Sequence, residues 1–284
     1  GLGHRYGQQT ALQGIEFSIA AGTRCALIGP DGAGKSSLLG LIAGVKILQQ
    51  GELDVLGGSI SARRHRTSLY PRIAYMPQGL GQNLYPELSI RENIQFFATL
   101  FGLSNTDFKQ RLPQLLSATD LTRFAERPAG KLSGGMKQKL GLCCALIHDP
   151  DLLILDEPTT GVDPLSRRSF WELVEQVRRE RPQLTLLVAT AYMEEAAQFE
   201  QCLMLDRGQL IAQGATAELA AATPSGKLDA AFTHFQGAQA GEQQALVIPP
   251  LAAGEAETAI EATDLTLRFG DFTAVDKVSF AIRR

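Results

Sequence analysis

The stretch Cys-Ala-Leu-Ile-Gly-Pro-Asp-Gly-Ala-Gly-Lys-Ser-Ser, residues 25–37, decides the fold of this chain. Its first four residues are apolar, as in a buried parallel strand, and a helix-forming stretch follows over 36–43. Between them, the glycines let successive backbone N–H groups turn toward one point, at the positive end of the helix dipole. Residues 29–36 match the phosphate-loop pattern Gly-x4-Gly-Lys-Ser/Thr at every position. The stretch therefore predicts a site for the phosphates of a nucleotide.

Two side chains in this loop carry the expected chemistry. Lys35 would place a positive charge on the β- and γ-phosphates, and the Ser36 hydroxyl is a suitable ligand for Mg²⁺. The alternative is a glycine-rich turn with an accidental Gly-Lys-Ser. The strand pattern before the loop and the helix pattern after it favour phosphate binding.

The composition excludes several classes of protein. The chain has 284 residues, 44% of them hydrophobic and 20% charged, which is typical of a globular protein with one or two domains. A net charge of −3 gives no electrostatic reason to expect nucleic acid as a partner. No apolar run approaches the length of about 18 residues that a membrane span needs. The four cysteines show no metal-binding or redox spacing, so we expect reduced residues in the core.

A pair of acids supplies the second part of a candidate catalytic site. Asp156 and Glu157 follow the apolar run 152–155, at the C-terminal end of an expected buried strand, where ligands bind in open α/β sheets. Asp156 fits the metal-side carboxylate of a phosphate-loop enzyme, and Glu157 fits a general base for water. In isolation, the two acids are better explained as the opening of a turn at Pro158. The phosphate loop upstream favours the catalytic interpretation.

Two further signals are weaker. Tyr6 has the chemistry of an aromatic platform for adenine, but periodicity alone favours an ordinary tyrosine at a strand end. Ser133 is an expected N-cap for a helix over 135–148, and Gly134 and Gly135 leave backbone N–H groups free for an anion.

Local patterns predict the other elements. The spacing of Ser89 and Glu92 is that of a capping box, which predicts a helix beginning at residue 90. We expect helices over 90–101, 106–125 with an interruption at Pro113, 165–179 and 191–199, and strands over 2–6, 12–19, 72–77, 184–189, 202–205 and 209–213.

Five motifs taken together identify a family. They are the phosphate loop, Gln78, Leu132-Ser-Gly-Gly135, the strand ending in Asp156-Glu157 and the turn Gly161-Val-Asp163, and their order and spacing resemble the nucleotide-binding domain of an ABC transporter over about residues 1–222. The resemblance implies an α/β fold of the ABC ATPase type: a phosphate-loop core with a mixed, mainly parallel sheet, an antiparallel β-subdomain and an α-helical signature subdomain. It also implies ATP and Mg²⁺ as ligands.

The resemblance assigns a role to each motif residue. It implies that Tyr6 stacks on adenine, that Gln78 senses Mg²⁺ and the γ-phosphate, and that Asp163 belongs to the D-loop. The signature residues Leu132, Ser133, Gly134 and Gly135 would contact ATP bound on an opposite domain. The implied phosphate-binding residues are Gly29, Pro30, Asp31, Gly32, Ala33, Gly34, Lys35, Ser36 and Ser37; the implied metal residues are Ser36, Gln78 and Asp156; and the implied catalytic residues are Glu157 and Gln78.

One position departs from the family pattern. In the family, the strand equivalent to 184–189 is followed by Thr-His, whereas this chain has Thr190-Ala191. The histidine would bridge the γ-phosphate, the attacking water and the opposing domain. The alanine therefore predicts a degenerate site that binds ATP and hydrolyses it slowly.

The residues between the motifs indicate one subclass of ABC transporter ATPases. Tyr75-Met-Pro-Gln78 and the stretches 85–93, 140–148 and 192–196 resemble ABC-2-type exporters, including drug exporters. This resemblance implies an ATPase subunit for multidrug or small-molecule efflux. It would bind integral-membrane permease subunits near residues 78–91, at the cytoplasmic face of the inner membrane.

Two other functions stay open. A soluble tandem ABC ATPase that acts on ribosomes would also carry two copies in one chain, but its linker is typically long, helical and charged. A nucleotide-binding regulatory half without turnover is favoured by Ala191 and opposed by Glu157.

The end of the chain repeats its beginning. Residues 264–284 align without gaps to the N-terminus at an offset of 263, so that Leu265 matches Leu2 and Phe269 takes the place of Tyr6. We therefore expect a first nucleotide-binding domain over 1–222, a linker over 223–258 and the first strands of a second, truncated domain over 259–284. The second domain of the same full-length chain would be the partner that completes the ATP site.

Overall fold

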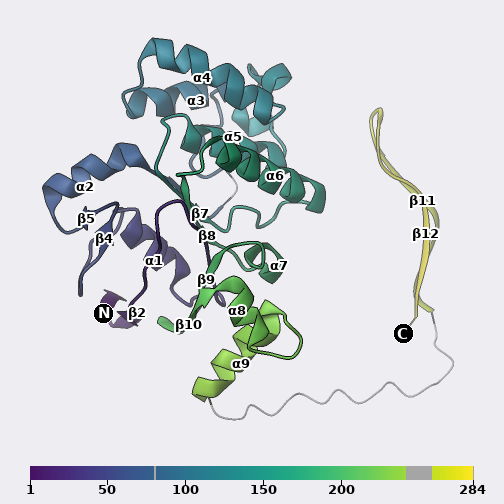
Figure 1. The fold of residues 1–284 in the computed structure, drawn as a ribbon. Helices are drawn as coiled ribbons and strands as arrows, with labels where there is room; N and C mark the ends of the chain where they lie inside the picture. Colours follow the sequence, from purple (N-terminus) through teal and green to yellow (C-terminus); the bar gives the residue numbers. More distant parts are fainter. Residues whose placement is uncertain (80, 241–257, 284) are drawn as a thin grey trace. The chain divides into compact units, whose positions relative to one another are not determined.

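The computed structural model describes residues 1–79, 81–240 and 258–283. It separates the chain into two compact units, Gly1–Gly241 and Glu242–Arg284, which are described one at a time. In the first unit, a six-stranded sheet lies between helices, and a mainly helical lobe extends beyond it (Figure 1).

The sheet has the strand order β10-β9-β3-β8-β7-β6, and only β10 is antiparallel to its neighbour. Strands β3, β7 and β8 are almost wholly buried and apolar, as expected of parallel strands covered on both faces. The strands are β3 (Arg24–Ile28), β6 (Ile73–Met76), β7 (Leu152–Asp156), β8 (Thr185–Ala189), β9 (Gln201–Asp206) and β10 (Gln209–Ala215).

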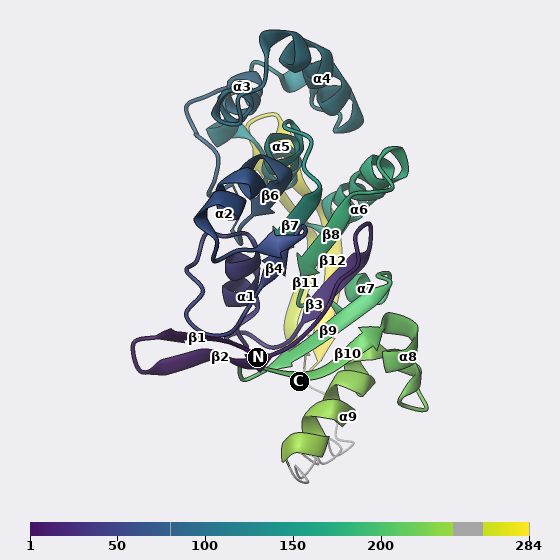
Figure 2. The ribbon, with the colours of Figure 1, turned by 60° about the vertical axis from the view of Figure 1, so that its left-hand side comes forward.

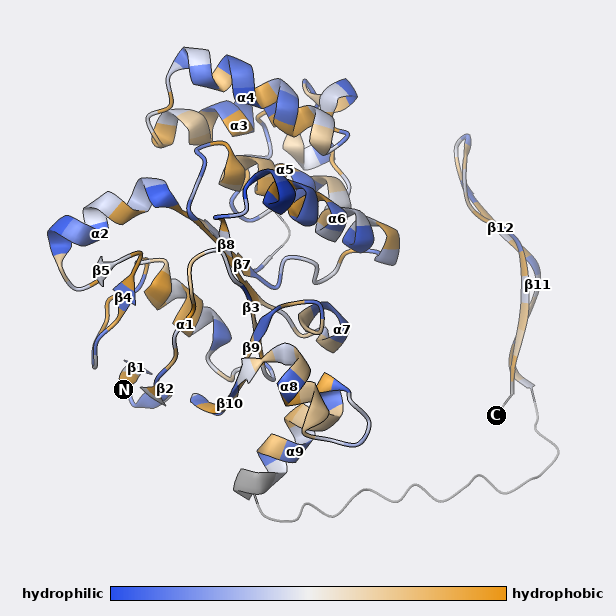
Figure 3. Cartoon of the chain, viewed as in Figure 1, coloured by the Kyte–Doolittle hydropathy of each residue, from blue (hydrophilic) through white to orange (hydrophobic). Residues whose placement is uncertain are grey.

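Alternate residues of each strand enter two different cores, because successive side chains point to opposite faces of a sheet. In β3, Ala26 and Ile28 pack with one core, whereas Cys25 and Leu27 pack with the other. Figure 3 shows the apolar residues of the central strands and of α1. The first core includes residues of α5 (Gly134–Leu146), α6 (Pro164–Glu180), α7 (Met193–Ala196), α8 (Thr216–Ala221) and α9 (Leu228–Ala240), and the second includes residues of α1 (Lys35–Ile42), β1 (Leu2–Tyr6), β2 (Gln9–Ile15) and β4 (Asp54–Val55).

Two small antiparallel hairpins, β1–β2 and β4 with β5 (Gly58–Ser59), form the antiparallel β-part of the first unit. Leu2, Leu12 and Ile15 are each no more than 2% exposed, so the β1–β2 hairpin is anchored in the core (Figure 2). Strand β2 ends at Ile15 rather than at the expected residue 19.

The helical lobe contains α3 (Ile90–Leu100), α4 (Asn105–Ala118) and part of α5, which share a third core. The expected capping box is confirmed, because Ser89 and Glu92 satisfy each other's backbone N–H groups at the start of α3. Helix α4 continues through Pro113 and stops at Ala118. Its end comes earlier than predicted because Asp120 adopts a left-handed backbone with φ 57°. A further short helix, α2 (Arg63–Leu69), lies outside this lobe. The expected α/β class with a mixed sheet, an antiparallel part and a helical subdomain is confirmed.

The first unit extends beyond the predicted boundary at residue 222. Helix α9 lies within the expected linker, yet Leu228, Ala231 and Phe232 are buried against the first core. The Gln236 amide also donates to Asp206 Oδ2 at 3.3 Å. The linker prediction was based on composition, and it overlooked apolar residues at helical spacing. The rest of the expected linker, residues 241–257, lies outside the described residues.

The second unit is described as one hairpin, β11 (Thr258–Phe269) and β12 (Phe272–Arg283). Its cross-strand pairs match those of β1–β2 at the offset of the sequence repeat. Leu265 pairs with Val278 as Leu2 pairs with Ile15, and Phe269 pairs with Phe272 as Tyr6 pairs with Gln9. The register shifts after Leu265 and Leu267 match those after Leu2 and His4. Gly7 and Gly270 both have φ 58° in the turns.

The four cysteines are all buried and unpaired, as the sequence predicted. Burial raises the pKa of the Cys202 thiol and that of the Cys143 thiol, each to about 12. Within the described ranges, the structure has no helix that combines the length and the apolar character required to cross a bilayer.

Candidate nucleotide site

The phosphate loop connects β3 to α1 and is shaped by its glycines. Gly34 is the N-cap of α1 and has φ 105°. A side-chain carbon at this position would lie 2.5 Å from the carbonyl oxygen of Ala11 and 2.8 Å from Leu12 Cδ2. Glycine is therefore required here both by the backbone conformation and by the contact with strand β2. The same contact fixes the β1–β2 hairpin against the loop.

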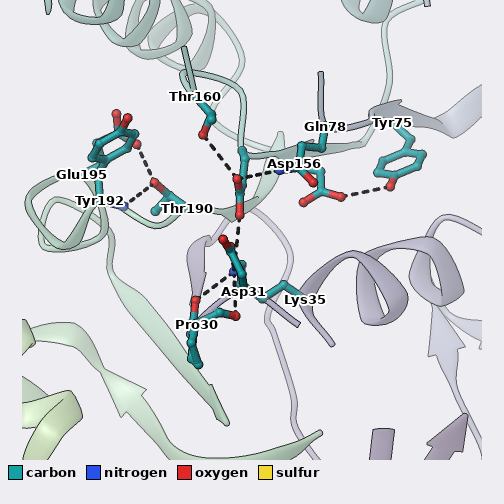
Figure 4. Close-up of polar contacts among 12 residues, drawn as sticks. Pro30, Asp31, Lys35, Tyr75, Gln78, Asp156, Thr160, Thr190, Tyr192 and Glu195 are labelled. Carbon is teal, nitrogen blue, oxygen red and sulfur yellow. Dashed lines mark hydrogen bonds and ion pairs between the residues drawn. The ribbon is translucent and has the colours of Figure 1, made fainter. Parts of the chain in front are cut away.

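The Lys35 ammonium lies at the centre of this loop. The residue is only 5% exposed, and Nζ donates to the carbonyl oxygens of Gly29 at 2.8 Å and Pro30 at 3.2 Å. Nζ also lies 3.3 Å from Glu157 Oε1 and 3.9 Å from Asp31 Oδ1 (Figure 4). A buried cation is thus placed where the backbone of the loop converges, which suits a chain of phosphates.

Asp156 ends β7 beside this cation and has the properties of a metal ligand. It is 2% exposed, and its Oδ2 accepts a hydrogen bond from the Tyr75 hydroxyl at 3.3 Å. Its Oδ1 is buried without a hydrogen-bond partner among the described residues. Burial raises the pKa of Asp156, while a hydrogen bond from Ser36 acts in the opposite direction. A bound cation would satisfy the free oxygen and favour the ionised carboxylate.

The hydroxyl of Ser36 and the carboxylate of Asp156 fit the oxygen ligands that Mg²⁺ prefers. The described residues contain no group of three or more histidine, cysteine, aspartate or glutamate side chains that could hold a metal. Mg²⁺ commonly takes one or two protein ligands and completes its shell with phosphate oxygens and water. Ser36 and Asp156 can supply that pair.

Glu157 follows Asp156 and is held in a specific position. It is 8% exposed and has a left-handed backbone, with φ 48°. Its N–H donates to the carbonyl oxygen of Ala189 at 2.8 Å, which ties it to the end of β8. Its Oε2 accepts from Gln78 Nε2 at 2.9 Å and from Thr160 Oγ1 at 3.3 Å. In this structure the hydrogen bond of the Gln78 side chain therefore goes to the candidate base and not to Asp156.

Tyr6 lies next to the phosphate loop although it comes from a different strand pair. Its hydroxyl is 3.1 Å from Ser37 Oγ, and its ring is edge-on to His4 with the centroids 4.9 Å apart. Lys46 Nζ lies 5.0 Å from the ring centroid. The residue is 47% exposed, so part of the ring is free to stack on a base. Its position beside the loop favours the adenine platform over an ordinary strand-end tyrosine.

The signature residues lie in the helical lobe, apart from the phosphate loop. Leu132 is buried in the core of that lobe, and the exposed Ser133 caps α5 by accepting from Met136 N–H at 3.3 Å. Gly134 begins the helix. Asp163 caps α6, accepting from Ser166 N–H at 2.9 Å, and the hydrogen bonds from Ser166 lower the pKa of this carboxyl.

Ala191 follows β8 and is exposed. The residues on either side of it are anchored. Thr190 N–H donates to the carbonyl oxygen of Leu27 at 3.2 Å, and its hydroxyl donates to Glu195 Oε2 at 2.7 Å. Glu195 belongs to the stretch 192–196, which was assigned to the exporter subclass without a role for this carboxylate. Thr160 was not predicted, and its only signal was its place as the second threonine after Pro158.

The fold and these contacts define an α/β phosphate-loop nucleotide-binding domain with a separate helical lobe. A family model described as ABC transporter matches residues 12–160, and the chain belongs to this family.

The similarity to individual members extends over much of the chain. It is 32% identical, over 340 aligned positions, to the probable multidrug ABC transporter ATP-binding protein YbhF of Escherichia coli, covering 96% of this chain and 58% of that protein. It is 38% identical over 220 residues to the Nod factor export ATP-binding protein I of Ralstonia nicotianae, covering 77% of this chain and 67% of the relative. A solved ATP-binding subunit of an ABC transporter superposes with a TM-score of 0.73 at 28% identity, covering 83% of this chain and 97% of that one. The chain thus spans little more than half the length of YbhF.

Proposed function

We propose that this chain is the ATP-binding and ATP-hydrolysing part of a subunit that powers an ABC-2-type exporter of drugs or other small molecules. The contacts at the carboxyl ends of β3 and β7 carry this proposal. There, Lys35 lies 3.3 Å from Glu157, which also accepts a hydrogen bond from Gln78 at 2.9 Å. A phosphate-binding cation, a candidate base and a polar sensor are thus in direct contact.

The residues divide the work as follows. The loop 29–37 holds the phosphates through backbone N–H groups and Lys35, and Tyr6 stacks on the base. Ser36 and Asp156 hold Mg²⁺, with Gln78 responding to it; the ion would neutralise charge on the β- and γ-phosphates. Glu157 orients a water and accepts its proton, because its carboxylate is fixed by Gln78 and Thr160 beside the loop.

A second domain completes the site. The exposed Ser133, the first turn of α5 and Asp163 serve an ATP held on that opposite domain. Leu165, two residues beyond Asp163, is 81% exposed, which suits a face that another domain covers. The β11–β12 hairpin has the register, the bulges and the turn of β1–β2, which supports a second nucleotide-binding domain of the same full-length chain as this partner.

Integral-membrane permease subunits are the second expected partner, at the cytoplasmic face of the inner membrane. The named relatives are an ATP-binding protein of a multidrug transporter and one for Nod factor export. On the helical lobe, Tyr85 and Phe96 are partly exposed and stack edge-on with their centroids 4.6 Å apart, and Leu100 is 64% exposed. These apolar side chains adjoin the predicted docking stretch and suit a protein partner.

A regulatory half that binds ATP without turnover is the second candidate. The observation that favours it is Ala191, which offers no polar side-chain atom at the end of β8. The two candidates predict different rates of hydrolysis at this site.

Steady-state ATPase assays of the full-length protein with its permease test the proposal. Glu157→Gln should lower kcat about 10²- to 10⁴-fold, as expected for loss of a general base, while binding of a fluorescent ATP analogue is retained. Equal rates for Glu157→Gln and the parent protein would refute hydrolysis at this site. Ala191→His should raise single-site turnover if the missing imidazole limits the rate; no gain would refute the degenerate-site interpretation.

A further inference from the structure

The start of α6 touches the signature without any intervening side chain. A side-chain carbon at Gly135 would lie 2.6 Å from Ser166 Cβ and still closer to its Oγ. Ser166 in turn donates its N–H to Asp163 Oδ1 at 2.9 Å. The first turn of α5 therefore rests directly on the first turn of α6, and only glycine permits this approach.

The next residue of α6, Arg167, lies against the loop after β8. Arg167 Nε lies 3.8 Å from Glu195 Oε1, and its guanidinium lies 3.7 Å from the centroid of the Tyr192 ring. Adjacent residues of one helical turn thus contact the signature and this loop, which we name the switch loop and define as residues 190–192.

Glu195 holds the switch loop from inside the protein. It is only 6% exposed, and its two carboxylate oxygens accept from Thr159 Oγ1 at 2.8 Å and from Thr190 Oγ1 at 2.7 Å. Tyr192 N–H donates to Thr190 Oγ1 at 3.1 Å (Figure 4). Both neighbours of Ala191 are therefore fixed, one by Glu195 and the other by Arg167.

Burying the Glu195 carboxylate costs desolvation free energy, which an apolar side chain of similar volume would avoid. The polar contacts of Glu195 do something that packing alone does not. Its hydrogen bonds fix the loop after β8 and the loop after β7 relative to each other, and its ion pair with Arg167, at 3.8 Å, connects both loops to α6. Phe170, Leu173 and Val174 anchor α6 in the core, so its first turn can transmit this position as one rigid body.

We propose that the first turn of α6 is a rigid link between the switch loop of this site and the signature, with Glu195, Arg167 and Ser166 as its positioning residues. Through this link, a displacement of the switch loop at this site changes the position of Gly135. The inference rests on the proposed function in one respect: the signature serves the opposite ATP site.

Amide hydrogen exchange of the full-length protein tests the link without requiring turnover. Glu195→Gln preserves size but removes the charge that Arg167 faces. We expect exchange of the first α5 amides, residues 135–138, to become at least about threefold faster. The control is Glu194→Gln, because the neighbouring Glu194 is exposed. Equal exchange in the two variants would overturn the proposal.

Kinetics then separate positioning from general destabilisation. The polar contacts of Glu195 and Arg167 described above do not include the phosphate loop, so Glu195→Gln and Arg167→Gln should lower kcat about tenfold while KM for ATP and Tm stay near the parent values. Arg168→Gln is the matched control, since Arg168 carries the same charge on the exposed face of α6. An unchanged kcat in both link variants would refute the positioning role. If the parent protein shows no turnover, the proposed hydrolysis fails, and the exchange result still decides the link.

A double variant tests whether Ser166 and Glu195, at the two ends of the link, act through the same rigid body. Ser166→Ala removes the hydroxyl that abuts Gly135, and Ser169→Ala on the same helix is its control. If Ser166 and Glu195 act through one body, Ser166→Ala combined with Glu195→Gln should lower kcat no further than the stronger single variant. Effects that multiply would show two independent sites and would overturn the proposal.

Discussion

The two hairpins β1–β2 and β11–β12 share one backbone pattern, and within the described residues they differ in how deeply their side chains are buried. Each pair, each register shift and the turn of β1–β2 recurs in β11–β12, which continues beyond them with further pairs toward Thr258 and Arg283. Leu2 is 2% exposed in the first hairpin, whereas its match Leu265 is 48% exposed in the second. The register of a hairpin is thus set locally by its turn and its alternation. Its stability and its function depend on what packs against it, which for β1–β2 is the core and the phosphate loop.

The largest expected difference between the hairpins concerns stability. Leu12 is 1% exposed and would contact a side chain at Gly34, so Leu12→Ala should lower the free energy of unfolding of the first unit by about 2–5 kcal/mol. Its match, Val275, is only partly buried, and Val275→Ala in the 284-residue chain should cost less than about 0.5 kcal/mol. Urea unfolding measures both. Comparable losses in the two variants would contradict the view that packing separates the hairpins.

Substitution of Tyr6 tests whether the first hairpin contributes an aromatic ring to ATP binding. Phe269 stands where the first hairpin has Tyr6, so Tyr6→Phe imposes the aromatic residue of the second hairpin on the first. It removes the hydroxyl, which contacts Ser37, but keeps the ring, and should change ATP affinity less than about threefold. Tyr6→Ala should weaken binding by about 1–3 kcal/mol, or about 5- to 150-fold, if the ring stacks on adenine. Titration with a fluorescent ATP analogue gives both values; equal affinities of the alanine and phenylalanine variants would exclude the stack.

The smallest expected effect is a dependence of stability on pH. Burial lowers the pKa of His4, and the charge of Lys46 adds to this, so the folded state favours the neutral ring. The neutral His4 ring contributes its full stabilisation at a pH above the pKa of histidine in the unfolded chain, about 6.5. This contribution is lost as the pH falls below that value. Leu267 occupies the matching position. His4→Leu should therefore reduce the decrease in Tm between pH 7.5 and 5.5, and an unchanged decrease would show that His4 does not contribute to it.

Much of the fold was accessible from the sequence because its strongest signals are local. The phosphate loop, the Ser89–Glu92 capping box and the apolar strands each depend on a few neighbouring residues, and the structure has all of them. The end of α4 was missed because Asp120, which ends the helix with a positive φ, is not glycine.

The contacts of the site were less accessible, because they join distant parts of the chain. The motif pattern named Gln78 and Glu157 separately, but it did not show that they are hydrogen-bonded to each other. Glu195 and Arg167 are ordinary charged residues of helical stretches in the sequence. Their importance emerges only when β8 and α6 bring them together. Helix α9 was missed for a different reason: the composition of 223–258 concealed an apolar stripe that the first core covers.

The four buried thiols have a practical consequence. All cysteines of the 284 residues are in the core, and their raised pKa values keep them protonated and slow to react with alkylating reagents. A single cysteine placed on the surface, for example Arg168→Cys on the exposed face of α6, would therefore accept a spectroscopic label selectively without prior removal of the native ones. Distances between such labels would follow the start of α6 directly as nucleotide is added.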